Sequence, residues 1–418
     1  MENTNLEILK NRLKQAWQNF ENKATQQQID SARQVLKKHS DALFASTTKS
    51  GIKPSEFSLV ISILEETLEG DIKSLLSKFV GDDQKNMDEL KQDIELKPRV
   101  LADGEILGFG KYEVLDYHWT EASIVWLENY FDDRDFPTPG TWLTIPDQIS
   151  LAIFGDWGGG TWDDNAVAQN ISTAIKNLKP DYSIHLGDVY YAGESDQEQT
   201  FLLNLWPTAQ TANFTLNSNH EMYPNGKGYF ETALPNSYFE VQGGKSFFAL
   251  ENTNWIIVGL DSAFHADINH LYLQGAISTE QSNFLSQVAA KDKQVIVMCH
   301  HNPLDITGKI KNPLWDQVAG MLGDNLKYWY WGHIHGGAVY KAMDGVNCRL
   351  VGHGVIPWGN AKSLADSSAA VWYENTPANN STDDVRVQNG FAVITLDDSS
   401  MQETFYGENG ESHWTSQH

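Results

Sequence analysis

The sequence is poor in cysteine, with only Cys299 and Cys348 among its 418 residues. Two cysteines cannot build the disulfide framework that is typical of small secreted domains, so the composition favours a reducing compartment. Residues 1–5 include neither a basic cluster nor an apolar run, and no signal peptide is therefore expected. We expect a cytoplasmic protein.

Positive charge is also scarce, because 30 Lys and Arg residues face 55 Asp and Glu residues and give a net charge of −25. A surface of this sign repels a polyanion, so no nucleic-acid partner is expected. No stretch approaches the roughly 18 consecutive apolar residues that a membrane-spanning helix needs, so no membrane partner is expected either. In contrast, 41% of the residues are hydrophobic, which is enough for a large packed core.

Three segments differ in their residue pattern. Residues 1–98 repeat apolar residues at helical spacing and are predicted to form an all-helical module, through which a homo-oligomer could assemble. Residues 99–146 are rich in Gly, Pro and aromatic residues and are interpreted as a connecting segment, in which residues 121–130 fit a helix or a strand. Residues 147–418 alternate short apolar strands with amphipathic helices, the pattern of an α/β domain.

Polar residues follow the predicted strands of this third segment at five junctions. One helix at about residues 164–178 joins the strands before Asp156 and Asp188, so these strands are predicted to be parallel and to end at the same sheet edge. Oxygen and imidazole ligands at one edge predict a site for two metal ions, with Asp188 central enough to bridge them. The junctions carry Asp156, Asp188, Asn219-His220, His300-His301 and His333-x-His335.

In their order along the chain these motifs resemble those of the calcineurin-like metallophosphoesterases, and most closely those of the purple acid phosphatase branch. Gly158 stands where most of that superfamily has a histidine, and Tyr191 follows Asp188 at the spacing typical of the purple branch. The resemblance covers about residues 149–410. Together with the strand pattern, it implies two packed mixed β-sheets flanked by helices in four layers. The motifs are Gly155-Asp156-x-Gly158, Gly187-Asp188-x-x-Tyr191, Asn219-His220-Glu221, Val297-x-x-His300 and Gly332-His333-x-His335.

The resemblance also implies a role for each matching residue. A first metal would be held by Asp156, Asp188, Tyr191 and His335, and Fe(III) would suit the phenolate of Tyr191. A second metal, Fe, Zn or Mn, would be held by Asp188, Asn219, His300 and His333. His220 would act as proton donor to the leaving oxygen, and Glu221 would orient a neighbouring ligand. The strand phase favours His300 over His301 as the ligand, and Tyr223 is a candidate for orienting a ligand or contacting substrate.

The implied activity is hydrolysis of a small-molecule phosphate ester, most simply a phosphomonoester, by in-line attack of a metal-bound hydroxide, as in an acid phosphatase. The metal core is common to monoesterases and diesterases, so a phosphodiesterase acting, for example, on cyclic nucleotides is an alternative. A non-catalytic metal-binding scaffold working through residues 1–98 is a second alternative. Scaffolds of this kind usually lose ligands, whereas this chain fills every ligand position.

Overall fold

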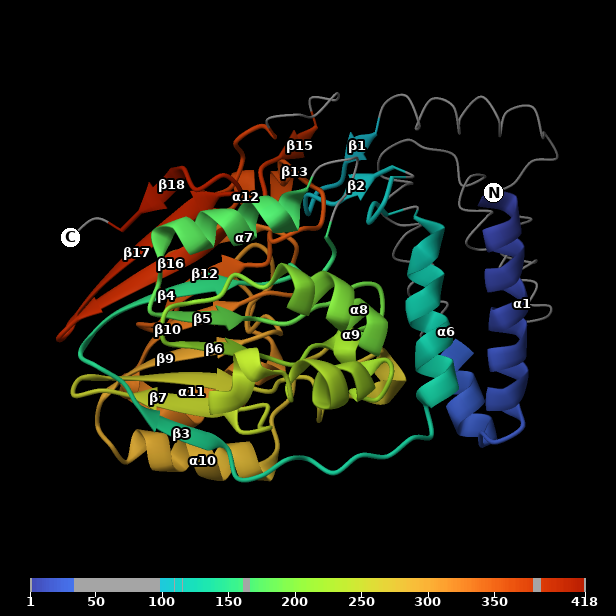
Figure 1. Ribbon diagram of the computed structural model, residues 1–418, viewed down its shortest axis with the longest axis horizontal. Coiled ribbons are helices and arrows are strands. Elements are labelled where there is room, and N and C mark those ends of the chain that lie inside the picture. The colour runs from blue at the N-terminus through green and yellow to red at the C-terminus, as the bar shows by residue number, and fades with distance from the viewer. Residues whose placement is uncertain are drawn as a thin grey trace.

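A computed structural model describes residues 2–33, 98–108, 110–114, 116–160, 166–378 and 385–416. The helices expected between residues 34 and 97 lie outside the described residues. Within the described part, no helix is long and apolar enough to cross a membrane. Figure 1 shows two β-sheets stacked at the centre and a helical pair at one side, formed by α1 (Glu2–Glu21) and α6 (Thr120–Asn129).

The first sheet has six strands in the order β18-β17-β16-β4-β5-β6. The strands β4, β5 and β6 are mutually parallel, and β16, β17 and β18 extend the sheet in antiparallel fashion. The expected parallel pair is therefore present, with α7 (Val167–Leu178) as its crossover helix. The strands span Gln148–Phe154 (β4), Tyr182–His185 (β5), Ala212–Thr215 (β6), Gly390–Asp397 (β16), Ser400–Gly407 (β17) and Ser412–Thr415 (β18).

The second sheet has eight strands in the order β14-β11-β12-β10-β9-β8-β7-β3. Its centre, β8-β9-β10-β12, is parallel, whereas β7 and β8 form an antiparallel hairpin. Its strands span Thr141–Thr144 (β3), Phe248–Glu251 (β7), Trp255–Leu260 (β8), Gln294–Cys299 (β9), Leu326–Trp331 (β10), Gly337–Tyr340 (β11), Asn347–Val351 (β12) and Ala370–Tyr373 (β14).

The two sheets pack face to face, because one buried cluster contains residues of both, such as Ile153 and Phe214 with Ile296 and Val351. The outer face of the six-stranded sheet is covered by α7, and that of the eight-stranded sheet by α10 (Thr279–Ala289) and α11 (Pro313–Leu322). This confirms two packed mixed sheets flanked by helices. The α10 helix begins at an N-cap, where the Ser278 side chain accepts a hydrogen bond from the Gln281 N–H.

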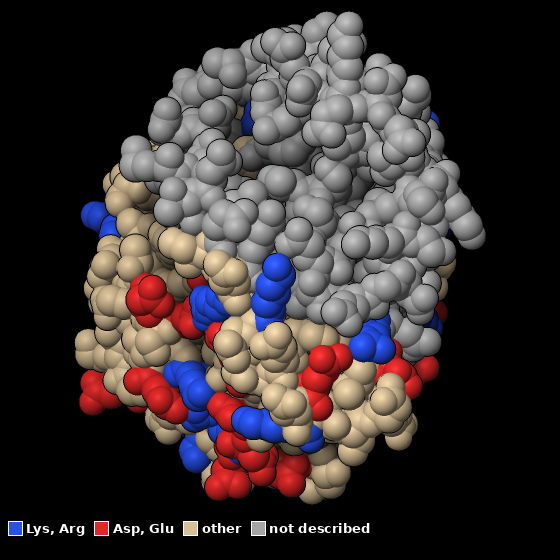
Figure 2. All heavy atoms as spheres, turned by 90° about the vertical axis from the view of Figure 1, so that its right-hand side faces the viewer, with Lys and Arg blue, Asp and Glu red and all other residues tan. Residues whose placement is uncertain are grey.

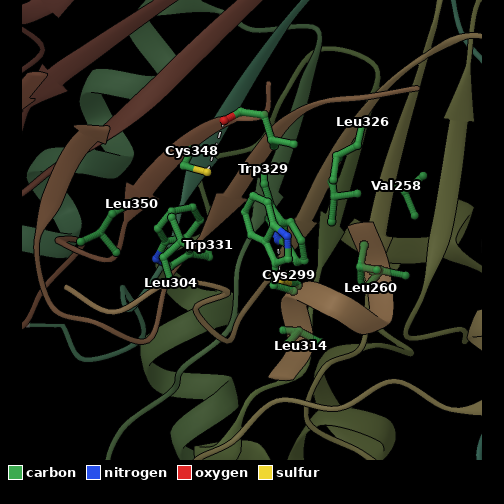
Figure 3. Close-up of a cluster of buried hydrophobic side chains, with 14 of the residues drawn as sticks. Val258, Leu260, Cys299, Leu304, Leu314, Leu326, Trp329, Trp331, Cys348 and Leu350 are labelled. Atoms are coloured by element: carbon green, nitrogen blue, oxygen red, sulfur yellow. Dashed lines mark hydrogen bonds between the residues drawn. The ribbon is translucent and has the colours of Figure 1, made fainter. Parts of the chain in front are cut away.

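Figure 3 shows the core between the eight-stranded sheet and α11, where Trp329 and Trp331 pack near Leu314. Cys299 and Cys348 lie in this core as buried free thiols. Trp329 donates its indole N–H to the Cys299 sulfur at 3.2 Å. Both cysteines therefore serve as packing residues within their strands, β9 and β12.

The remaining elements are short and lie mainly in the loops between the strands. They are β1 (Arg99–Val100), β2 (Ile106–Leu107), α8 (Ser195–Gln197), α9 (Asn219–Met222), β13 (Trp358–Gly359), α12 (Lys362–Ala365), β15 (Arg386–Val387) and 3₁₀ or π turns at Tyr117–Trp119, Glu198–Leu202, Leu203–Leu205, Tyr229–Ala233, Ser237–Gln242, Ile268–His270 and Gly323–Asn325.

Residues 121–130, which the sequence left open between helix and strand, belong to the helix α6. It is buried on two sides, because α1 packs against one side and the loops of residues 263–272 against the other. A helix covered on two sides has no single apolar stripe, which explains why its periodicity was ambiguous. Trp17 and Phe20 of α1 join Trp126 and Tyr130 in this contact.

The face formed by α1 and α6 carries charges of both signs among uncharged residues, as Figure 2 shows for the part that it colours. Arg12 of α1 pairs with Glu128 of α6 at 2.7 Å, and Lys227 pairs with Asp132 at 2.8 Å. The carboxylate run at residues 132–135 is thus engaged, through Asp132, in an ion pair with the third segment of the chain.

Candidate metal centre

The polar residues predicted from the strand ends converge at one edge of the paired sheets. In the six-stranded sheet, Phe154 of β4, His185 of β5 and Thr215 of β6 are neighbours in register. In the eight-stranded sheet, Cys299 of β9 is likewise level with Trp331 of β10. The loops that follow these residues are joined by backbone hydrogen bonds, including Asp156 N–H to Gly187 C=O and Gly332 N–H to His300 C=O, both at 3.0 Å.

One group of candidate ligands consists of Asp156, Asp188 and His335, whose donor atoms all lie within 4.8 Å of one another. The Tyr190 hydroxyl lies in the middle of this group. It is 3.1 Å from Asp188 Oδ2, 3.3 Å from Asp156 Oδ1 and 3.2 Å from His335 Nε2. Carboxylate, phenol and imidazole donors at this spacing can bind a hard or borderline cation.

The second group surrounds His300 Nε2, which is 2.9 Å from Asn219 Oδ1, 3.1 Å from His333 Nδ1 and 3.3 Å from Asp188 Oδ1. The other ring nitrogen, Nδ1, lies 3.0 Å from the Leu186 carbonyl and must donate to it, which leaves the Nε2 lone pair facing the site. Asp188 therefore offers Oδ2 to the first group and Oδ1 to the second, the geometry of a bridging ligand.

His301 is close to this second group, but both of its ring nitrogens are engaged elsewhere. Nε2 lies 2.7 Å from the Tyr272 carbonyl, and Nδ1 lies 2.9 Å from the Ser262 hydroxyl. His300, His301 and His333 have donor atoms within 4.8 Å of one another. Of the two neighbouring histidines, His300 is the one whose Nε2 faces Asn219, Asp188 and His333. The geometry thus agrees with the preference for His300 that the strand phase gave.

Tyr191 does not lie where the sequence motif placed it. Its hydroxyl donates to Asp116 Oδ2 at 2.5 Å, and its ring is enclosed by residues of the connecting segment. The neighbouring Tyr190, which the motif does not single out, directs its hydroxyl into the ligand group instead. The sequence indicates Tyr190 as an alternative to Tyr191 only through the fact that the two tyrosines are adjacent, because either one can reach the site from a loop.

His220 lies beside the shared carboxylate, with Nε2 at 3.9 Å from Asp188 Oδ2. Its Nδ1 is 2.6 Å from the Tyr191 carbonyl, and a carbonyl only accepts, so Nδ1 carries a proton and Nε2 is the atom that faces the site. The side chain is 11% exposed at this edge. It is therefore placed to hold or give a proton at Nε2.

The predicted supporting residues surround the ligands. Tyr223 accepts a hydrogen bond from Asn219 Nδ2 at 3.0 Å, which turns Asn219 Oδ1 toward His300. Ser218 caps α9 and bonds through its hydroxyl to both Asp188 and Glu221. Glu221 is thus linked to the Asp188 carboxylate through the Ser218 hydroxyl.

The site concentrates buried carboxylates, and their charges act on one another. Burial, reinforced by Asp188, raises the pKa of Asp156 well above its ordinary value. Burial together with Asp188 also raises the pKa of Glu221 to about 8. Burial lowers the pKa of His300 and His335 to about 3, so both imidazoles are neutral donors at pH 7. Cations between these groups would relieve the repulsion of the carboxylates.

The space around the Asp156 carboxylate is a further observation that suits these residues to binding a metal. A Cβ at Gly332 would lie 2.4 Å from Asp156 Oδ2, and one at Gly352 would lie 3.0 Å from it. The two glycines therefore make room for a carboxylate held against the backbone, where it accepts the His333 N–H at 2.9 Å. The remaining lone pairs of Asp156 are left for the ligand group.

Known proteins similar to this chain include metal-dependent phosphatases. No curated protein sequence matches it significantly. Among solved structures, GAP50, the anchor in the inner membrane complex of Plasmodium, is 16% identical with a TM-score of 0.44, covering 64% of this chain and 88% of its own. The purple acid phosphatase PPD1 of yellow lupin seeds is 16% identical with a TM-score of 0.43 and coverages of 65% and 54%. A dimetal phosphatase from Danio rerio is 14% identical with a TM-score of 0.44 and coverages of 62% and 96%.

One family model matches part of the chain. Residues 149–337 match the model of the calcineurin-like phosphoesterases, and this range contains Asp156, Asp188, His300 and His335. It extends from β4, at the first motif, to the beginning of β11, just after the last. Residues 149–337 of the chain are therefore similar to the calcineurin-like phosphoesterases.

Proposed function

We propose that the protein hydrolyses phosphomonoesters with two metal ions at the edge of its sheets. The first ion would be held by Asp156, Asp188, Tyr190 and His335, and the second by Asp188, Asn219, His300 and His333. When bound, such ions supply Lewis-acid polarisation of phosphoryl oxygens and a nucleophile derived from water at neutral pH. The observation that carries the proposal is Asp188, whose two carboxylate oxygens face the two ligand groups separately.

The phenol of Tyr190 supports a hard trivalent ion such as Fe(III) at the first position, with Fe, Zn or Mn as the divalent partner.

The charge balance supports a dianionic substrate. Two divalent ions and two aspartates give +4 − 2 = +2, and Fe(III) with a divalent ion, two aspartates and a phenolate gives +5 − 3 = +2. A phosphomonoester is largely a dianion at pH 7, because its second pKa is about 6, whereas a diester carries one charge.

His220 is the residue of this chain that would serve the leaving group. Its Nε2 lies beside Asp188, and its Nδ1 proton is held by the Tyr191 carbonyl. A proton given from Nε2 to the ester oxygen as the P–O bond breaks would leave a neutral imidazole with its remaining proton on Nδ1. Such a proton transfer contributes about 10²–10⁴-fold to rates in known enzymes.

Paired initial rates on a chromogenic phosphomonoester and the matching diester would test the proposal, with iron, zinc or manganese supplied. We expect the monoester to be hydrolysed faster, and Asp188→Asn to lower kcat by at least about 10²-fold. Asp133→Asn, at an exposed position of the connecting segment, is the matched control and is expected to leave the rate unchanged.

Two other outcomes would contradict the proposal in different ways. Faster turnover of the diester would make the protein a phosphodiesterase and would direct attention to cyclic nucleotides. No turnover of either ester, with two metal ions bound per chain, would support the non-catalytic scaffold.

A further inference from the structure

The Tyr191 side chain is surrounded by the connecting segment. Its ring centroid is 5.0 Å from that of Tyr112, 5.8 Å from that of His118 and 5.0 Å from that of Trp119. The side chain is almost completely buried, although it comes from a motif loop at the sheet edge. A residue from the motif is thus locked into a segment that precedes the phosphoesterase domain in the sequence.

Asp116 is the polar anchor of this contact. Its carboxylate, which is 3% exposed, accepts the Tyr191 O–H at 2.5 Å and the Tyr112 N–H at 2.9 Å on Oδ2. On Oδ1 it accepts the His118 N–H at 3.0 Å and faces His118 Nδ1 at 2.7 Å. One buried carboxylate therefore organises a turn of the connecting segment and fixes the Tyr191 hydroxyl to it.

The same tyrosine holds His220 through its backbone. The Tyr191 carbonyl accepts the His220 Nδ1 proton at 2.6 Å, which sets both the tautomer and the direction of the ring. Trp119 packs over the pair, with its ring centroid 6.0 Å from that of His220 and its indole N–H donated to the Glu113 carbonyl at 2.9 Å. A continuous path thus leads from the connecting segment to the site. Asp116 bonds to the Tyr191 hydroxyl, and the Tyr191 carbonyl bonds to His220.

We propose that Asp116 is a positioning residue for His220, so that the connecting segment completes the catalytic site. It acts by holding the Tyr191 ring, which keeps the Tyr191 carbonyl aligned with His220 Nδ1 and directs Nε2 toward the leaving oxygen. The reaction itself is the one already proposed: water supplies an oxygen to phosphorus, the P–O bond to the leaving group breaks, and the Nε2 proton goes to the departing oxygen. This inference rests on that proposed function for its kinetic consequence, but not for its geometry.

The kinetic test uses two phosphomonoesters that differ in their need for a proton. An alkyl phosphate has a poor leaving group that must be protonated, whereas p-nitrophenyl phosphate departs as a stable anion. We expect Asp116→Asn and Tyr191→Phe to lower kcat for the alkyl phosphate by about tenfold to 10²-fold, and for the nitrophenyl ester much less. In a His220→Gln background the same changes are expected to add little further loss, because they act through His220.

The second test reads His220 directly and does not depend on turnover. In protein labelled with ¹⁵N-histidine, the His220 Nδ1–H signal is assigned by its absence from His220→Gln. We expect its exchange with water to speed up by at least about tenfold in Tyr191→Phe and Asp116→Asn, and to be unchanged in Asp133→Asn. Tyr191→Phe is the milder variant, since it removes a single hydroxyl and keeps the ring.

Unchanged exchange in both variants would overturn the positioning role even in an inactive protein. Equal rate losses for both esters, or losses that add to that of His220→Gln, would overturn it in an active one. Faster exchange without any esterase activity in the parent protein would support the positioning and refute the proposed function alone.

Discussion

Three of the candidate metal ligands have a left-handed backbone that residues with a side chain rarely adopt. The φ angle is +55° at Asp156, +76° at Asp188 and +66° at His333. Each such conformation costs on the order of 1–3 kcal/mol unless the surroundings enforce it, and such residues collect at functional sites. Here the turns bring side chains from neighbouring loops toward one another, so the strain is concentrated where the ligands converge.

At the level of single residues, the tyrosine pair makes a sharp prediction. Tyr190→Phe in iron-loaded protein is expected to abolish the visible phenolate-to-iron absorption, because the Tyr190 hydroxyl is the one that faces the ligand group. Tyr191→Phe is the matched control and is expected to retain the band, since its hydroxyl bonds to Asp116. The measurement is a visible spectrum at equal iron content.

Loss of the band in Tyr191→Phe alone would restore the assignment that the sequence motif favoured. A colourless parent protein that holds Fe(III) would remove phenolate ligation for both tyrosines.

At the level of elements, the two sheets are joined by a buried ion pair as well as by apolar packing. Arg349 of β12 binds Glu403 of β17 through Nε and Nη2, each at 2.7 Å, and the Tyr330 hydroxyl donates to the same carboxylate at 2.5 Å. Both charged side chains are almost fully buried. The pair therefore joins the two sheets whose edges carry the two groups of candidate metal ligands.

Removing one partner of this pair is expected to be costly. Arg349→Met should lower the free energy of unfolding by about 3–5 kcal/mol, because it leaves the Glu403 carboxylate buried without its cation. The Arg349→Met/Glu403→Leu double variant should recover a large part of that loss, since no charge is then buried. Urea denaturation of the three proteins measures both effects.

A loss below about 1 kcal/mol in Arg349→Met would mean that solvent reaches Glu403 and that the pair behaves like an exposed one. A double variant no more stable than the single one would mean that shape, rather than charge, sets the alignment.

For the whole molecule, the sheets and the strand-end ligands were predictable because their signals are local. Apolar runs end at polar residues, and one crossover helix is enough to make the β4 and β5 strands parallel. The position of Tyr190 was not predictable, because Asp116, 75 residues away from Tyr191 in the sequence, decides which tyrosine turns toward the site. The same holds for α6, whose burial on two sides depends on α1 and on distant loops.

The packing of the connecting segment against the site also could not be predicted from the sequence. Its composition indicated a linker, yet Gly104 packs on Trp358, and Trp119 packs on His220. These contacts depend on the path of the chain around the sheet edge, which no local periodicity encodes. The boundaries expected at residues 98 and 146 remain predictions.

The outer strands of the two sheets are joined by a titratable pair that makes the stability of the whole molecule depend on pH. His413 of β18 faces Glu374, next to β14, with Nδ1 2.5 Å from Oε2. The hydrogen bond to Glu374 raises the pKa of His413 above its ordinary 6.5. Burial opposes the charge of Glu374, but the hydrogen bond from His413 leaves its pKa below the ordinary 4.5.

The two shifts fix the pH window in which the pair stabilises the fold. The His413 contribution is complete below pH 6.5 and is lost as the pH rises through the raised pKa of the folded state. The Glu374 contribution is complete above pH 4.5 and is lost as the pH falls through the lowered pKa.

Both are present together between pH 4.5 and 6.5, so His413→Gln should lower the free energy of unfolding more at pH 5.5 than at pH 9. Urea denaturation at the two pH values measures the difference, and Glu374→Gln is the matched variant, since breaking the pair from either side should give the same pH dependence. Equal losses at both pH values would show that His413 stabilises the sheets by packing rather than by charge.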